Sequence, residues 1–160
     1  MGFATHLGPW LLGTVKNTTG TTAGTVCNTG ATVVAQPVVV GFAAINTSLT
    51  GTIGAIPAGA AILSVRYITS TVFSAATTLT VSIGGSAYEA SAATITSVGS
   101  ITSTQQASFG TKAANVGTTD ALVTTTFTKA GTLTTGSVTI IVEYIVRDSS
   151  GNAIPPANQQ

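Results

Sequence analysis

The sequence predicts an all-β protein: an antiparallel β-sandwich or jelly roll that follows an N-terminal hairpin or extended arm. Threonine makes up roughly one residue in five, and its branched Cβ suits a pleated sheet better than the interior of a helix. Several segments alternate apolar and polar residues, which is the period of a half-buried strand. Glycines separate these segments at short intervals, as is typical of sandwiches and jelly rolls.

Length and composition bound the number of domains. The chain of 160 residues is long enough for one domain, or for one domain with an arm. Charged residues make up 6% of it, where about 25% is usual, while the hydrophobic fraction of 44% is ordinary. A chain of this hydrophobicity with a net charge of +1 is expected to fold. We expect an assembly arm or hairpin over residues 1–30, a β-sandwich over 31–148 and an extended tail over 149–160.

The first expected elements are strands. GTVKN at 13–17 recurs as GTVCN at 24–28 after a Gly/Thr connector, which favours two paired strands. The segments 33–40 and 50–56 are the next strand candidates, with a turn at Gly41 between them.

Alternation is clearest in the middle of the chain. In the segment 61–69, Leu63, Val65 and Tyr67 are expected on one face, with Ile62, Ser64, Arg66 and Ile68 on the other. In ATTLTVSIGG, residues 76–85, we expect the apolar residues at 79, 81 and 83 to face the core and the glycine pair to form a turn.

The last part of the chain predicts three more strands and one interruption. The strands are expected at 93–98, at 121–128 and within 137–148. The last of these has an apolar face at its even positions and a half-apolar second face, which we expect another strand, the arm or a neighbouring chain to cover. The segment 103–115 reads as a long loop or one helical turn, and Gly99, Gly117 and Gly131 as turns.

Catalytic and metal-binding chemistry lacks its usual residues. The chain has one histidine, His6, and one cysteine, Cys27, so it is poorly equipped for a Ser-His-Asp triad or a four-ligand zinc site. A glycosidase needs two carboxyl groups about 5 to 10 Å apart, and no spacing suggests such a pair among the four available. These are Glu89, Asp120, Glu143 and Asp148. We therefore expect no enzymatic activity, no cofactor and no metal site.

The sequence also predicts no nucleic-acid partner and no membrane association. The five basic residues are scattered along the chain and cannot form a phosphate-binding stripe. The longest apolar run, 33–45, contains Gln36 and Pro37 and is too short to cross about 30 Å of hydrocarbon. The N-terminus has no basic region before its apolar residues, so no signal peptide is expected.

Four segments together resemble a known family. They are ATHLGPWLLGTVKNTTGTTAGTV at 4–26, IPAGAAILSV at 56–65, TTLTVSIGG at 77–85 and GSVTIIVEYIVRDSSG at 136–151. They are similar to small virion proteins of tailed bacteriophages, and most of all to capsid decoration or cement proteins. The resemblance implies a compact sandwich or jelly roll, often trimeric, that binds the outer face of the phage head and braces neighbouring subunits of the major capsid protein. It implies no catalytic residues.

The resemblance also implies a place and a partner. The protein would be made in the host cytoplasm and act on the outer capsid surface, with the major capsid protein and its own copies as partners. We expect the arm to add strands to a partner sheet. Its interface residues would be His6, Pro9, Trp10, Leu11, Leu12, Val15 and Val26. Two alternatives remain open: a tail or fibre module of the virion, and a bacterial adhesin or carbohydrate-binding β-sandwich.

Overall fold

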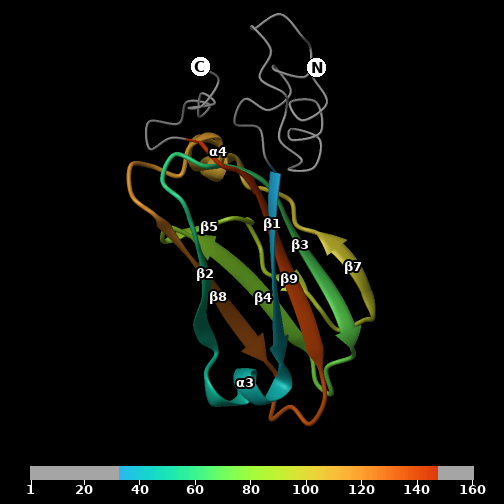
Figure 1. Ribbon diagram of the computed structural model, residues 1–160. Coiled ribbons are helices and arrows are strands. Elements are labelled where there is room, and N and C mark those ends of the chain that lie inside the picture. Colours follow the sequence, from blue (N-terminus) through green and yellow to red (C-terminus); the bar gives the residue numbers. More distant parts are fainter. Residues whose placement is uncertain (1–32, 148–160) are drawn as a thin grey trace, which may run out of the picture.

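The predicted all-β sandwich is confirmed by the computed structural model, which describes residues 33–147 (Figure 1). Two antiparallel sheets pack face to face. One sheet has four strands in the order β1-β9-β3-β7, and the other has the order β2-β8-β4-β5, with β6 also paired to β4. The predicted arm at 1–30 and tail at 149–160 lie outside the described residues.

The element bounds follow the chain from β1 to β9. The strands are β1 (Val33–Gly41), β2 (Thr50–Ile56), β3 (Ala61–Thr71), β4 (Thr77–Ile83), β5 (Ser86–Ala87), β6 (Ala93–Thr94), β7 (Gly99–Thr102), β8 (Ala121–Lys129) and β9 (Ser137–Ile145). The helical elements are α3 (Phe42–Thr47), the 3-10 turn η1 (Ala107–Phe109) and α4 (Gly110–Ala114). In Figure 1, α3 closes the lower end of the sandwich and α4 lies at the upper end.

The core lies between the sheets and follows the predicted alternation on β4 and β9. Leu79, Val81 and Ile83 are fully buried, and so are Val138 and Ile140 on the facing sheet. The polar residues between them on β4 are half-buried, because successive side chains of a strand point to opposite faces. Within the described residues no helix is long and apolar enough to cross a membrane.

Strand β3 departs from the prediction at two adjacent residues, Ile62 and Leu63. Leu63 was expected to share a face with Val65 and Tyr67, but it is 47% exposed, whereas Ile62 is buried. The register with β9 shifts between Ile62 and Ser64. This bulge inserts one residue and reverses the phase of the alternation. The expected two-residue alternation of buried and exposed side chains therefore places the residues on its N-terminal side on the wrong faces.

The predicted strand at 93–98 was wrong. Its first two residues pair with β4 as β6, and the chain then crosses to the other sheet, where β7 pairs with β3. Gly99, which was expected to be a turn, instead begins β7, with φ at 149°. A segment that crosses from one sheet to the other has no single buried face. The alternation of its apolar residues therefore does not predict one continuous strand.

Two short helical elements interrupt the sheets. The segment 103–115 contains η1 and α4, which confirms the helical turn rather than the long loop. Helix α3 was not predicted, since Gly41 was read as a simple turn. Its Ile45 is 1% exposed and enters the core. Its Asn46 donates to the carbonyl of Leu133 at 2.6 Å and accepts from the Leu133 N–H at 3.0 Å.

The edges of the sheets are protected without charged residues. Strand β1 carries Pro37 at its centre, and proline has no backbone N–H with which to pair a further strand. Strand β2 has a register shift between Thr52 and Gly54, and such a bulge twists an edge away from a straight partner. The edges on the other side, β7 and β5, are only four and two residues long.

Candidate functional site

None of the predicted interface residues can be placed. His6, Pro9, Trp10, Leu11, Leu12, Val15 and Val26 all lie outside the described residues, as do Cys27 and Asp148. The described residues offer two other candidates. One is an apolar surface on the outer side of the four-stranded sheet, and the other is a pocket beside a buried carboxyl group.

The apolar surface is built by the outward-facing residues of two paired strands. On β1 these are Val33, Ala35, Pro37 and Val39, all exposed, and Val39 is 66% exposed. The antiparallel register pairs them with Ile145, Glu143, Ile141 and Thr139 of β9, which are half-buried. We call these eight residues the β1–β9 face. It contains the half-apolar second side of β9 that the sequence predicted.

The β1–β9 face carries almost no net charge. Its one ionised residue, Glu143, has an oxygen 3.7 Å from the guanidinium of Arg66 on β3. Ser64, also on β3, donates a hydrogen bond of 2.5 Å to the other oxygen of Glu143. Between Lys16 and Arg66 the sequence contains no charged residue at all. A partner of this face therefore meets apolar side chains and a neutralised ion pair.

A groove continues the apolar surface around the edge of the sandwich. It has a volume of about 230 Å³ and lies between β1, α3 and β2. Val39 and Val40 line it from the four-stranded sheet, and Ile53 and Phe127 line it from the other sheet. The exposed side chain of Val39 thus belongs both to the β1–β9 face and to the lining of this groove, whose other named apolar residues are half-buried or buried.

The buried carboxyl group belongs to Glu89, which follows β5 and is 5% exposed. Its Oε1 accepts from the hydroxyl of Tyr67 at 2.8 Å and from the backbone N–H of Val81 at 3.0 Å. Its Oε2 is 3.2 Å from the hydroxyl of Ser103. Since Tyr67 and Val81 belong to opposite sheets, this one side chain ties the two layers together.

The local fold explains why the carboxyl group lies there. Strands β5 and β6 pair with the two ends of β4 along one edge and leave its middle without a strand neighbour on that edge, while β8 pairs with β4 along the other edge. Tyr88 still donates its N–H to the carbonyl of Val81 at 2.8 Å. The carboxyl oxygen of Glu89 accepts the Val81 N–H, so it replaces the backbone carbonyl that a continuous strand would provide.

Burial dominates the acid–base behaviour of this cluster. It raises the pKa of Glu89, although hydrogen bonds from Tyr67, Val81 and Ser103 act to lower that pKa. Burial and then the charge of Glu89 raise the pKa of Tyr67, and the same two causes raise the pKa of Tyr88. Both tyrosines are therefore neutral at physiological pH.

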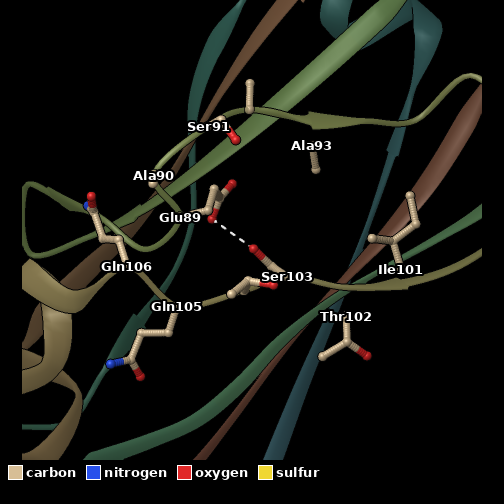
Figure 2. A pocket seen from close by; sticks show the side chains of 11 residues that line it. Glu89, Ala90, Ser91, Ala93, Ile101, Thr102, Ser103, Gln105 and Gln106 are labelled. Atoms are coloured by element: carbon tan, nitrogen blue, oxygen red, sulfur yellow. Dashed lines mark hydrogen bonds between the residues drawn. The ribbon is translucent and has the colours of Figure 1, made fainter.

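A pocket of about 380 Å³ opens beside this cluster (Figure 2). Residues 89–93 line one side of it, and residues 101–106 line the other. The carboxyl group of Glu89 and the hydroxyl of Ser103 face one another across the two segments, as the dashed line in Figure 2 shows. Glu89 is the one ionisable residue among those that line the pocket.

The other described carboxyl groups lie elsewhere. Asp120 accepts the N–H of Ala58 at 3.0 Å in the connection that leads to β8, and Glu143 lies on the β1–β9 face. Within residues 33–147 no three His, Cys, Asp or Glu side chains come together as metal ligands. In the sequence, Glu89 was visible only as a possible glycosidase carboxyl, and its cluster was not predicted. The partners of Glu89 lie far from it in the sequence: Tyr67, Val81 and Ser103 are 22, 8 and 14 positions away. No local motif therefore predicts the cluster.

The raised pKa of Glu89 predicts an unusual pH dependence of stability. Between the usual pKa of about 4.5 and the higher folded value, the folded chain binds more protons than the unfolded chain. The contribution of Glu89 to the free energy of unfolding is therefore fully present below about pH 4.5 and is lost as pH rises through the folded pKa. We expect the difference between wild type and Glu89→Gln, measured by urea unfolding from about pH 4.5 to pH 8, to shift in favour of the variant. A difference that shifts the other way would contradict a raised pKa.

Comparison of the chain with protein-family models and with curated proteins found no match.

Proposed function

We propose that this protein is a structural virion protein that binds the outer face of a phage capsid and braces neighbouring subunits of the major capsid protein. The observation that carries the proposal is the β1–β9 face, an exposed apolar sheet surface with a neutralised ion pair. Soluble monomers rarely expose large contiguous apolar surfaces, and such surfaces commonly serve as interaction sites. The resemblance of four sequence segments to capsid decoration proteins supplies the identity of the partner.

The form of the edges supports docking through a face rather than through strand addition. Pro37 and the bulge of β2 hinder a further strand on the side where the apolar surface lies. The face itself keeps its side chains outward and available. A partner that covers it buries Val39 and its neighbours without having to compete for backbone hydrogen bonds.

The three tyrosines give no support to the glycan-binding alternative, and among the described aromatic residues only Phe42, at 36%, is exposed. Carbohydrate recognition on a β-sandwich usually relies on an exposed aromatic ring. All three tyrosines of the chain are buried: Tyr67, Tyr88 and Tyr144 are 0%, 3% and 7% exposed. Tyr88 packs edge to face against Phe109, with ring centroids 5.3 Å apart. These rings stabilise the core and are not free to stack on a sugar.

A charge placed on the β1–β9 face should abolish attachment. We expect Val39→Glu to lower occupancy on particles of the encoding phage at least tenfold, because an unpaired carboxylate would be buried in the contact. A tenfold loss corresponds to about 1.4 kcal/mol. The measurement is the number of copies per purified particle, counted by mass spectrometry after the variant and the wild type are added to particles that lack the protein.

Leu122→Glu is the matched control. Leu122 is 55% exposed on β8 of the opposite sheet, so its replacement adds the same charge on the other side of the molecule. Equal occupancy of both variants would exclude the β1–β9 face as the docking surface. A wild-type copy number that fits a tail or fibre axis and not the icosahedral head would favour the fibre module. The homotrimer stays a prediction, which sedimentation of the free protein tests.

A further inference from the structure

We propose that the pocket beside Glu89 binds a positively charged nitrogen head group, a primary ammonium or a guanidinium, against the buried carboxylate. The inference rests on the pocket itself and is independent of the capsid role. The head group has two sources, a free alkylamine or the Lys or Arg side chain of a partner protein. The chemistry that recognises it is the same in both cases.

The charge of the buried Glu89 carboxylate has no cationic partner in the described part of the chain. Glu89 is 5% exposed, and the partners of its carboxyl group are a tyrosine hydroxyl, backbone N–H groups and a serine hydroxyl, all of them neutral. The ammonium of Lys112 is engaged at the β4–β5 turn, where it donates to the carbonyl of Gly84 at 2.7 Å. Buried carboxylates are usually paired with a cation, and in the described part of the chain no basic residue lines this pocket.

One oxygen of the Glu89 carboxyl group can accept a further hydrogen bond. A carboxylate has about four lone-pair positions, and the two donors to Oε1 occupy that oxygen. Oε2 accepts from the Ser103 hydroxyl at the longer distance of 3.2 Å. This oxygen faces Ser103, which also lines the pocket (Figure 2). A cationic N–H donor can reach it with a charge-assisted hydrogen bond, which is roughly twice as strong as a neutral one.

The size and lining of the pocket fit an alkylammonium ligand. A volume of about 380 Å³ is ample for an alkylammonium chain. Serine, threonine and glutamine side chains line the side formed by 102–106 and offer further oxygen acceptors to an ammonium. Ala93 and Ile101 lie together at one end of the pocket and provide apolar contacts for methylene groups (Figure 2). Acidic, hydroxyl-lined and partly apolar surroundings fit the head and the stem of such a ligand.

The test uses n-butylammonium chloride with the full-length protein, and thermal unfolding as the readout. At ten times the dissociation constant, a ligand that binds only the folded state raises the unfolding midpoint by roughly 3 to 6 °C. We expect this rise for the wild type at pH 8 and none with tetramethylammonium chloride, which has the same charge and no N–H donor. The rise should shrink as pH falls, because the proton and the ammonium compete for Glu89. The titratable groups that face it, Tyr67 and Tyr88, remain neutral throughout this range.

Variants separate the site from a general salt effect. Glu89→Gln keeps a carbonyl acceptor for Tyr67 and Val81 but has no charge, so it should show no rise with n-butylammonium. Asp120→Asn removes a carboxylate that lies outside the pocket lining and keeps an acceptor for the N–H of Ala58, so it should respond like the wild type. An equal response of the wild type and Glu89→Gln, or no response of the wild type at pH 8, would overturn the proposal. If Glu89→Gln fails to fold, the pH dependence of the wild-type response decides in the same way.

A second ligand distinguishes the two sources of the head group. Nα-acetyl-lysine N-methylamide presents the same ammonium on a peptide backbone with no other charge. A response equal to that of n-butylammonium supports a partner's side chain, because the open pocket then admits the attached backbone. A response to n-butylammonium alone supports a free amine. Both results place the ammonium at Glu89, and the loss of response in Glu89→Gln confirms that position.

Discussion

Replacing Glu89 with alanine is expected to lower the free energy of unfolding by about 3 kcal/mol or more, since it leaves several buried donors without an acceptor. The Tyr67 hydroxyl and the Val81 N–H both lose their bond to Oε1, and each unsatisfied buried group costs about 1 to 3 kcal/mol. A domain of this size is typically stable by about 5 to 15 kcal/mol, so the loss is a large part of the total. Urea unfolding followed by circular dichroism measures it.

Glu89→Gln is the control for this substitution. Its amide oxygen can accept from Tyr67 and Val81, and its NH₂ can donate to the Ser103 hydroxyl, which mimics the protonated carboxyl group. We expect its stability to lie within about 1 kcal/mol of the wild type at neutral pH. If alanine is tolerated as well as glutamine, the carboxyl group does not hold the two sheets together, and its role is confined to the pocket.

Gly136→Ala is expected to destabilise the sandwich by about 3 kcal/mol or more. A Cβ at this position would lie 2.0 Å from Cδ1 of Phe73, a distance that no side chain can tolerate without a shift. Phe73 is 3% exposed, so its ring has little room to move away. Gly136 also has φ at 132°, a conformation that costs a residue with a side chain about 1 to 3 kcal/mol. Overpacking of a core adds a similar amount.

Gly131→Ala tests whether the effect is specific to that position. A Cβ at Gly131 meets no atom within 4 Å, and we expect a change within about 0.5 kcal/mol. The double variant Gly136→Ala with Phe73→Ala removes the clash and keeps the backbone strain. Its loss of stability should be smaller than the sum of the two single losses, because the substituted residues are in contact. Additive losses would show that the clash is relieved by other means.

The sequence was informative where one face of a strand meets the core along its whole length. On β4 and β9 the alternation places every inward residue correctly, because burial of apolar side chains fixes the register of a half-buried strand. It failed at Leu63, where a bulge changes the phase, and at 93–98, where the chain passes between sheets. Both failures depend on strand pairing between residues that are far apart in the chain. The local pattern of apolar residues carries no information about such pairing.

The two candidate sites differ in the same way. The half-apolar side of β9 was visible in the sequence because the residues of one face recur at every second position. The exposure of Val39 next to it depends on the pairing of β1 with β9 and was not visible. The Glu89 cluster depends on three separate segments that meet only in the folded sandwich. A single acidic residue in a stretch of alanines and serines gives no local sign of such a meeting.

The way in which the sheet edges are protected has a consequence for solution conditions. Many β-proteins keep their edges apart with charged residues, and salt weakens that repulsion over a distance of about 10 Å at 0.1 M. Here a proline, a bulge and short strands do this by shape, and shape is not screened by ions. The sandwich can therefore leave its outer surface almost uncharged and still resist strand-to-strand association across a wide range of ionic strength.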